Sequence, residues 1–518
     1  MAKFSGWIKE ITLPPPSLQD NTGDVDRIID FLKHKLDVDT VDIDMGLLKT
    51  LPTILRKSKY SIRIILVKDN SRWLIIGIMP KDEPCVAAGL AVDLGTTMIV
   101  IRLIDLLTGK TMGEASFLNP QRLVGPDILT RLHFADSNGG LEQLNRLIID
   151  GLNQNIKKLS LSCGITENDI YIVSAAGNTA MTHLFLDLDP HWIIREPYIP
   201  VINSPNFLKA SSIGLMTNIF SRVFVFPNIG SYFGGDLIAG ILFSGLNKTD
   251  ETAILVDVGT NAEVVLGNKN WLMACAGAAG PALEGGVTKM GMMAGPGVID
   301  KVHPDPLTHG IKLHTIDDKT PIGICGSGLI DLAAYFFLSS VIDMRGKFIP
   351  SQCSGKLTKI DEINHFIVVS ADESAGREAL TISQVDLDSL IRSKAAMFTI
   401  LETITTHVGV PLTDLAKFYV AGTFGSFINP ESAIAIGMLP DLPMEKYKAL
   451  GNSSLGGATM ALLSPDSIEE INRIKNNITY MELNVNQEFM NRFSAAKFIP
   501  HTDPLRFPSV KIPVNSGR

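Results

Sequence analysis

The sequence predicts an α/β protein with mixed sheets, preceded by a small α+β module, and three observations lead to this fold class. From residue 89 onward, short apolar strands alternate with glycine-containing turns and helices, as in α/β domains. Two β-branched runs before that point predict a separate hairpin. The chain has 518 residues, more than one hydrophobic core usually covers, so we expect several domains.

Residues 1–86 are expected to form the small N-terminal α+β module. Within it, the apolar residues of 24–36 recur at helical spacing. The β-branched runs 61–67 and 72–79 flank a short polar turn, which predicts a hairpin. Residues 80–84 combine prolines with charged residues, and we expect them to link this module to the rest of the chain.

The hydrophobic periodicity of the remaining chain predicts its strands and helices. The predicted strands are apolar and often β-branched, and they cover 90–92, 99–104, 170–174, 223–226, 254–256, 263–266 and 418–420. The predicted helices carry apolar residues three and four positions apart, and they cover 141–159, 178–186, 329–337, 387–407, 456–463 and 487–495. This alternation of strands and helices is what indicates the α/β class.

Composition and charge exclude several classes of protein. Hydrophobic residues make up 45% of the chain and charged residues 19%, which is too apolar for a disordered protein. No apolar stretch reaches the length of a membrane span, and the N-terminus lacks the apolar core of a secretion signal. The formal net charge of −8, without a basic run, argues against nucleic acid as the main partner. We therefore expect a cytoplasmic protein without membrane or nucleic-acid partners.

The cysteines do not form a metal-binding motif. No two of the five cysteines lie close in sequence, and there is no C-x-x-C, ferredoxin-type spacing or H-E-x-x-H. An odd, scattered set of cysteines fits a reducing cytoplasm. We expect most of them to be small buried apolar residues. They are Cys85, Cys163, Cys275, Cys325 and Cys353.

A short motif occurs twice, each time after an apolar strand and before a second strand. Asp93-Leu94-Gly95-Thr96-Thr97 recurs as Asp257-Val258-Gly259-Thr260-Asn261. Glycine lets backbone N–H groups approach an oxyanion without a Cβ clash, and successive N–H groups form an anion-binding concavity. An aspartate at the strand end can hold Mg²⁺ through water. One such turn is more often structural, but two copies in matching contexts predict a polyphosphate site.

A third glycine-rich turn, Ala421-Gly422-Thr423-Phe424-Gly425, follows the strand predicted at 418–420. Its small residues would let a purine lie against the backbone, although taken alone it is equally typical of an ordinary turn. Other phosphate motifs fail. Gly109-Lys110-Thr111 lacks the first glycine of a Walker A loop, and no G-x-G-x-x-G follows a strand.

The order of these three motifs resembles the phosphate-1, phosphate-2 and adenosine motifs of the acetate and sugar kinase, chaperone and actin (ASKHA) superfamily. More closely, the chain is similar to the reductive activators of corrinoid proteins, over about residues 8–510. The stretches that carry this resemblance are 116–121, 125–131, 175–181, 227–236, 278–285, 325–331 and 498–503.

The resemblance implies a two-lobed, actin- and sugar-kinase-like fold of the ribonuclease H-like type. The first lobe would span 87–250, the second 251–475, and a C-terminal helix and tail 476–518. The implied ligands are ATP and Mg²⁺, and the implied partner is a corrinoid protein or corrinoid methyltransferase. The implied activity is ATP-dependent reduction of Co(II) to Co(I) in a methyltransferase system, by a homodimer.

The sequence departs from the family in two respects. The electron usually enters through an iron–sulfur domain, whereas this sequence begins at the family's middle module and lacks a cluster-binding motif. We therefore expect no iron–sulfur cluster in this chain and a separate low-potential donor such as a ferredoxin. A hydroxyl-bearing side chain is also expected near residues 274–278, where Ala276 and Gly277 offer none, which argues against direct contact with cobalt.

The resemblance assigns roles to individual residues. Asp93 and Asp257 would bind Mg²⁺ through water, and Asp236 or Glu263 would orient the attacking water, although Glu263 could also face solvent. Phosphate would be bound by Gly95, Thr96, Thr97, Gly259, Thr260 and Asn261, and adenosine by Gly422, Thr423, Phe424 and Gly425. Further expected contacts are Glu284 at the ribose or at lobe closure, Gly326 and Ser327 at an anion or hinge, and Lys394 at adenosine or on a solvated helix face.

Three other functions stay open at this point. A small-molecule kinase would use the same cleft and consume ATP with a sugar or carboxylate acceptor. A non-catalytic ATP-binding switch would dock a redox partner with little turnover. An activator of 2-hydroxyacyl-CoA dehydratases would need bridging cysteines, for which Cys163 and Cys325 are the available residues, although neither follows that motif.

Overall fold

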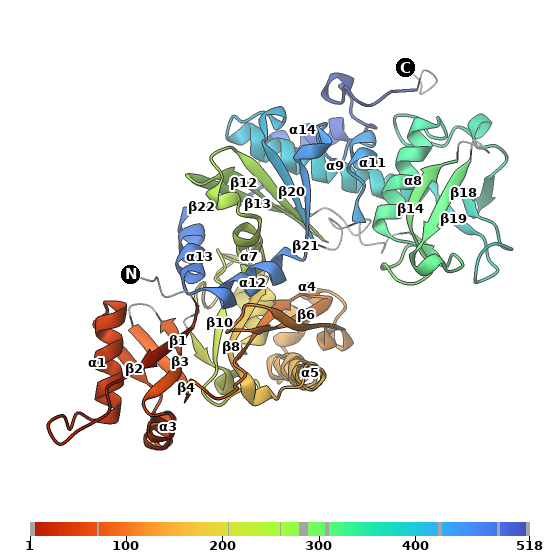
Figure 1. Cartoon of the computed structure of the whole chain (residues 1–518). Helices are drawn as coiled ribbons and strands as arrows, with labels where there is room; N and C mark the ends of the chain where they lie inside the picture. Colours follow the sequence, from red (N-terminus) through yellow and green to blue (C-terminus); the bar gives the residue numbers. More distant parts are fainter. Residues whose placement is uncertain are drawn as a thin grey trace. The chain divides into compact units, whose positions relative to one another are not determined.

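The computed structural model describes residues 6–69, 72–205, 207–259, 261–278, 288–305, 310–422, 427–483 and 487–513 (Figure 1). Glu284, Thr260, Thr423, Phe424 and Gly425, and the side chain of Asn261, lie outside the described part. The chain divides into two compact units. The first unit combines Met1–Phe243 with Ser453–Asn477, and the second combines Ser244–Asn452 with Ile478–Arg518.

The N-terminal module, which belongs to the first unit, is a four-stranded sheet in the order β1-β3-β4-β2 with helices packed on it. The predicted hairpin at 61–79 and the predicted helix at 24–36 are confirmed. In that helix, acidic residues occupy the first turn and basic residues the last, which complements the helix dipole. The elements are β1 (Ile8–Thr12), α1 (Asp24–Leu36), β2 (Val41–Ile43), α2 (Met45–Leu48), α3 (Leu51–Lys57), β3 (Ser61–Asp69) and β4 (Arg72–Pro80).

The large sheet of the first unit has the strand order β7-β6-β5-β8-β10-β9. Its first three strands form two antiparallel hairpins, and β8 and then β10 continue the sheet in parallel with β5. Its strands are β5 (Ala88–Leu94), β6 (Met98–Asp105), β7 (Thr111–Leu118), β8 (Ile170–Gly177), β9 (Leu208–Lys209) and β10 (Arg222–Val225).

Both faces of this sheet are covered. Leu90 and Val92 of β5 pack in one core with residues of α5 (Gly140–Ser162). On the other face, a Cβ at Gly89 would touch Leu462 of α12 (Ser453–Leu463). Figure 1 shows α5 and α12 on opposite sides of the sheet. The smaller helices of this unit are η1 (Pro120–Leu123), α4 (Ile128–Ala135), η2 (Glu167–Asp169), α6 (Thr179–Phe185), η3 (His191–Ile193), η4 (Ala210–Ile213), α7 (Gly235–Ser244) and α13 (Asp466–Asn477).

Helices α12 and α13 follow the second unit in sequence but pack in the first. We expected residues 453–475 to belong to the second lobe, because they come after its strands. The structure places α12 against β5 and β8 instead, and Trp7 of the N-terminal module donates its indole N–H to the carbonyl of Ala461. The apolar, glycine-containing α12 fits this position because Gly457 approaches the backbone of Ala239 too closely for a side chain.

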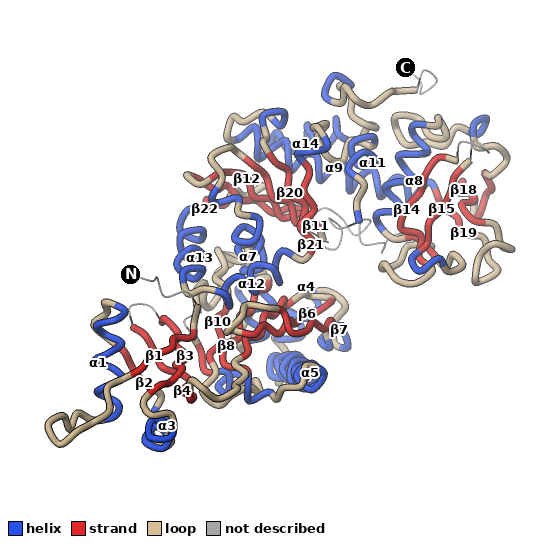
Figure 2. The backbone as a smooth tube through the Cα atoms, in the orientation of Figure 1, coloured by secondary structure: helices blue, strands red, loops and turns tan. Residues whose placement is uncertain are grey.

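The large sheet of the second unit has the order β21-β20-β11-β12-β13-β22 and repeats the pattern of the first (Figure 2). Strands β11, β12 and β13 are antiparallel hairpins, and β20 and then β21 continue in parallel with β11. The strands are β11 (Ala253–Val258), β12 (Asn261–Asn268), β13 (Trp271–Ala278), β20 (Lys417–Ala421), β21 (Tyr447–Gly451) and β22 (Ile478–Tyr480).

Helices α9 (Gln384–His407) and α14 (Gln487–Ala496) pack against each other on this unit, and α9 also contacts β12 and β13. Two small three-stranded sheets, β15-β14-β16 and β17-β18-β19, complete the same core with α8 (Gly326–Leu338). Their strands are β14 (Val298–Pro304), β15 (Ile311–Thr315), β16 (Gly323–Ile324), β17 (Leu357–Ile360), β18 (Ile363–Val369) and β19 (Leu380–Ser383).

The remaining helices of the second unit are short, and they are η5 (Leu246–Lys248), η7 (Ile316–Asp318), η8 (Pro350–Gln352), η9 (Leu412–Asp414), α11 (Pro430–Ala435), η10 (Met444–Lys446) and η11 (Pro504–Arg506). Throughout the described residues, none of the helices combines the length and the apolar character that crossing a bilayer requires.

Candidate nucleotide site

The first Asp-x-Gly-Thr motif lies at the end of β5, in the middle of the first sheet. Asp93 is paired across the sheet with Val100 of β6 and Ala176 of β8. Its carboxylate accepts a 2.9 Å hydrogen bond from the hydroxyl of Ser454 at the start of α12. The predicted strand–turn–strand arrangement is confirmed, whereas the contact with Ser454 was not predicted.

Gly95 is required by the packing of this turn. A Cβ at Gly95 would collide with the carbonyl oxygen of Met98 on the returning strand. The turn is also held from behind, because Asn119 donates from its side chain to the Gly95 carbonyl and from its backbone to the Thr97 carbonyl, at 3.0 and 2.9 Å. Arg131 donates to the Thr96 carbonyl at 2.8 Å. These contacts fix the shape of the loop before any ligand binds.

Asn178 links this loop to the neighbouring strand and helix. Its side-chain oxygen caps α6 by accepting from the Met181 N–H at 2.8 Å, and its side-chain nitrogen donates to the Thr96 hydroxyl at 3.1 Å. Asn119, Arg131 and Asn178 all lie in stretches of resemblance, but no sequence pattern indicates that they touch the glycine turn. They are the residues that sequence reasoning missed.

Asp236 lies at the same edge of the first sheet. It is in the first turn of α7, where its carboxylate accepts from the Leu237 N–H at 2.9 Å. A Cβ at Gly234 would collide with both the Asp236 carboxylate and the Cα of Asn178, so these two residues are close neighbours. The structure therefore brings Asp236 beside the residue that holds Thr96.

The second Asp-x-Gly motif occupies the corresponding position in the second sheet. Asp257 near the end of β11 lies directly opposite Glu263 on the antiparallel strand β12, and next to Ala421 on the parallel strand β20. Directly opposed residues of an antiparallel pair share one face of the sheet, with Cβ atoms about 4.5–5.5 Å apart. Glu263 is half-buried rather than solvent-facing.

Gly422 lies next to Asp257 in the second unit. Its backbone has φ +79°, a left-handed conformation that favours glycine. A Cβ there would be 2.7 Å from the carboxylate oxygen Oδ1 of Asp257. Gly422 of the adenosine motif is therefore packed against the aspartate of the second phosphate motif.

Two other expected contacts have structural partners instead. Ser327 in the first turn of α8 is buried and donates its hydroxyl to the Asp300 carbonyl of β14 at 3.0 Å, which anchors the helix that begins at Gly326. Lys394 was expected at adenosine or on a solvated face, but its side chain is buried. Its Nζ donates to the carbonyls of Phe498 and Pro500 at 2.5 and 2.7 Å, so we leave Lys394 out of the proposed site.

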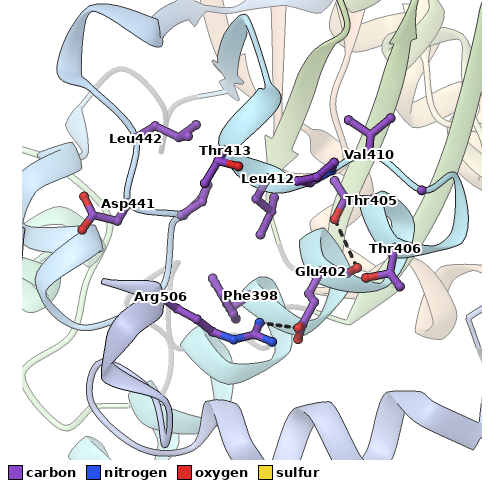
Figure 3. Close-up of a pocket in the computed structure, with 13 residues that line it drawn as sticks. Phe398, Glu402, Thr405, Thr406, Val410, Leu412, Thr413, Asp441, Leu442 and Arg506 are labelled. Carbon is purple, nitrogen blue, oxygen red and sulfur yellow. Dashed lines mark hydrogen bonds and ion pairs between the residues drawn. The ribbon is translucent and has the colours of Figure 1, made fainter. Parts of the chain in front are cut away.

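The cavity that the structure describes in the second unit is separate from Asp257 and Gly422 (Figure 3). It has a volume of about 420 Å³ and an apolar wall that includes Phe398, Leu412 and Leu442, with an ion pair between Arg506 and Glu402 at its edge. Its walls come from the segments that precede β20 and β21, whereas Asp257 and Gly422 lie at the opposite ends of the strands. Among the residues that the structure describes, none of those predicted to bind nucleotide lines it.

Metal ligands are not clustered in the part of the chain that the structure describes. No group of three or more histidine, cysteine, aspartate or glutamate side chains there could hold a metal ion directly. A magnesium ion that keeps most of its water ligands needs only one or two protein carboxylates, so it does not require such a group.

Comparison with known proteins gives a consistent result along the whole chain. Residues 7–84 match the RACo linker region, 88–249 the RACo middle region, and 251–511 the C-terminal ASKHA domain of RACo. The corrinoid activation enzyme RamQ of Eubacterium limosum is 30% identical over 470 residues, which cover 89% of this chain and 78% of that protein. A reductase of Methanosarcina barkeri, specific for the Co(II) methylated amine-specific corrinoid protein, is 24% identical over 424 residues, 76% of this chain and 73% of its own length.

A solved structure supports the same assignment. The reductive activator for corrinoid, iron-sulfur protein is 36% identical and superimposes with a TM-score of 0.87, over 98% of this chain and 82% of that one. The similarity covers the N-terminal module, both large sheets and the C-terminal segment. This chain therefore belongs to the RACo family of reductive activators and carries the ASKHA domain of that family.

Proposed function

We propose that this protein uses ATP to drive the reduction of a corrinoid protein from Co(II) to Co(I), with an electron from a separate donor. The observation that carries the proposal is the pair of matching sheets. In each sheet a strand ends in an Asp-x-Gly motif, and the aspartate is paired with a residue of the neighbouring parallel strand. Each motif supplies a carboxylate and a glycine turn, the features that a phosphate-binding loop requires. The names of the full-length relatives supply the corrinoid protein as the partner.

In this proposal, Asp93 of the first unit and Asp257 of the second unit are each suited to bind Mg²⁺ through its water ligands. The turn that contains Thr96 and Thr97 binds phosphate in the first unit, and Gly422 borders the adenosine in the second. Asp236 or Glu263 orients the attacking water. Mg-ATP supplies the negative charge that organises these groups and the free energy of hydrolysis.

The electron comes from a different molecule in this proposal. The five cysteines are scattered in sequence, and the described ones include Cys275, which is fully buried and whose thiol pKa is raised to about 12 by burial. A thiol with so high a pKa is a poor nucleophile at neutral pH. In this proposal a low-potential donor such as a ferredoxin, or a chemical reductant in vitro, supplies the electron.

ATP can drive an unfavourable reduction only if nucleotide and partner bias the same equilibrium. A ligand shifts a conformational equilibrium only by its difference in affinity for the two states, and coupling between two ligands is reciprocal. The typical coupling of roughly 1–3 kcal/mol corresponds to about 5–150-fold in affinity. We therefore expect the Co(II) form of the partner to increase ATP affinity by the factor by which ATP increases partner affinity.

The test measures ATP turnover with a purified corrinoid protein from the same genome. We expect hydrolysis to rise when that protein is in its Co(II) state and to fall back when cobalt is methylated. The Asp257→Asn variant serves as the inactive control. Turnover that ignores the cobalt state contradicts the proposal. Turnover that depends on an added sugar or carboxylate would instead indicate a small-molecule kinase, and tight binding without turnover a passive switch.

A further inference from the structure

A buried arginine lies directly behind the first phosphate loop. The Arg131 side chain, on α4, has no exposed surface. Its Nε donates to the Gly125 carbonyl at 2.9 Å, and Nη1 donates to the Thr96 carbonyl at 2.8 Å. The third nitrogen, Nη2, has no hydrogen-bond partner among the described residues. A guanidinium is charged at all physiological pH values, so a full positive charge is buried under this loop.

The charge of Arg131 is not balanced in the way that the other buried arginines are. In the described part of the chain, Arg27 pairs with Asp20 at 2.5 Å and Arg222 pairs with Asp44 at 3.1 Å. Arg131 has no such ion pair in the same described residues. A buried charge is costly unless it is paired, and burial accordingly lowers the pKa of Arg131.

Asp127, whose charge favours the charged form of Arg131, makes its hydrogen bonds to other groups. Asp127 caps α4, where one carboxylate oxygen accepts from the Thr130 N–H at 2.9 Å and the other from the Thr130 hydroxyl at 2.7 Å. Asp127 contributes a favourable charge at some distance, and Arg122 contributes an unfavourable one. The net charge of Arg131, Arg122 and Asp127 together is therefore positive.

The geometry of the loop directs its donors away from Arg131. The carbonyls of Gly95, Thr96 and Thr97 all accept hydrogen bonds from Asn119 or Arg131 on the protein side. In a trans peptide the N–H points opposite to the carbonyl of the same peptide unit. The N–H groups of Thr96 and Thr97 consequently point to the other side of the loop, where an anion would lie.

We propose that Arg131 is a positioning residue and the built-in counter-charge for the phosphates of the nucleotide. It holds the Thr96 carbonyl so that the loop N–H groups face the polyphosphate, and its charge is balanced only when that polyphosphate binds across the loop. The ligand recognised by this part of the site is the phosphate chain rather than the nucleoside. This inference rests on the proposed nucleotide site and deepens it.

The test compares the binding of Mg-ATP, inorganic tripolyphosphate and adenosine by calorimetry. Arg131→Gln should lower the affinity for Mg-ATP and tripolyphosphate by about tenfold, because a buried charge next to the phosphates is lost. Adenosine binding should not change. Arg131→Lys keeps the charge but cannot reach both carbonyls, so it should recover part of the loss. Arg222→Gln, which removes another buried arginine of the same unit, is the matched control and should bind all three ligands as the wild type does.

A second variant keeps the proposal testable if Arg131→Gln fails to fold. Asp127→Asn removes the negative charge that favours the charged form of Arg131, and asparagine caps a helix as well as aspartate does. It should therefore fold and bind tripolyphosphate about two- to fivefold more tightly. Unchanged or weaker tripolyphosphate binding by Asp127→Asn would by itself overturn the role of Arg131, as would wild-type binding by any folded Arg131 variant.

The outcomes separate this inference from the proposed function. If the wild type binds Mg-ATP and the Arg131 variants bind it equally well, the proposed function stands and the inference is wrong. If the wild type binds neither Mg-ATP nor tripolyphosphate, the proposed nucleotide site itself is wrong. Loss of adenosine binding in parallel with tripolyphosphate binding would show a general structural effect and would also contradict the inference.

Discussion

Ser454 donates a 2.9 Å hydrogen bond to the carboxylate of Asp93, although 361 positions separate the two residues in sequence. The aspartate ends β5, and the serine begins a helix that packs on the same sheet. Ser454 occupies one oxygen of the carboxylate and fixes its orientation. The carboxylate is thereby held in one position, as the proposed role in Mg²⁺ binding requires.

Removal of this hydroxyl should weaken nucleotide binding without unfolding the protein. Ser454→Ala should lower Mg-ATP affinity by about fivefold, which corresponds to the loss of one hydrogen bond to a charged group. Thr459→Ala removes a hydroxyl from the same helix and should leave the affinity unchanged. Calorimetry on both folded variants decides the matter, and equal affinities in the two would contradict the role of Ser454.

The two acidic residues of the second unit should have separable roles. Asp257→Asn should abolish the Mg²⁺-dependent part of ATP binding, because it removes a carboxylate proposed to hold the ion. Glu263→Gln should lower turnover while affinity changes less than twofold, because it would remove only the group that orients water. Glu251→Gln, on the exposed chain before β11, is the control. Wild-type turnover in Glu263→Gln would indicate that Asp236, and not Glu263, orients the attacking water.

Gly422 offers a direct test of how closely the adenosine motif approaches Asp257. Gly422→Ala should be destabilised by about 1 kcal/mol from its positive φ alone. Its free energy of unfolding should fall by more than this, because the new Cβ would be 2.7 Å from the Asp257 carboxylate. Gly409→Ala shares the positive φ, at +70°, but meets nothing within 4 Å, so it reports the backbone effect alone. If urea unfolding shows that Gly422→Ala and Gly409→Ala lower the free energy of unfolding equally, the contact with Asp257 does not matter.

Lys394 should give the stability of the protein a measurable pH dependence. Full burial holds the pKa of Lys394 well below the usual 10.5 in the folded protein. Between the pKa of Lys394 in the folded protein and its pKa of about 10.5 in the unfolded chain, the amine is protonated only in the unfolded chain. The contribution of Lys394 to the free energy of unfolding therefore rises with pH between these two values. Lys394→Met should lack this rise and bind ATP normally. Urea unfolding at several pH values up to about 10 measures it, and identical pH profiles would contradict the burial of a titrating amine.

Local patterns in the sequence predicted much of this fold. The helix at 24–36 and the duplicated strand–turn–strand motif follow from hydrophobic period and glycine placement, and both are confirmed. The strand Thr111–Leu118 was missed because it is mostly exposed or half-buried and shows little apolar alternation. Helix α13 was also missed, although its apolar residues, such as Ile471 and Ile474, are three apart.

The part of the site that sequence reasoning could not reach depends on long-range pairing. Ser454 reaches Asp93, and Arg131 reaches Thr96, only because the sheet brings distant segments to one edge. Lys394 was misplaced for a related reason. A lysine on a helix normally lies on a solvated face, and only the C-terminal segment, whose carbonyls accept hydrogen bonds from its Nζ, accounts for its burial.

The most direct test of the central claim follows cobalt itself. The assay mixes this protein with a corrinoid protein from the same genome in the Co(II) state, a low-potential reductant such as Ti(III), and Mg-ATP, and it records the Co(II) absorption band. We predict that the band decays rapidly with ATP and slowly without it, and that Asp257→Asn abolishes the difference. Decay at the same rate with and without ATP would contradict the assignment of this protein as an ATP-driven reductive activator.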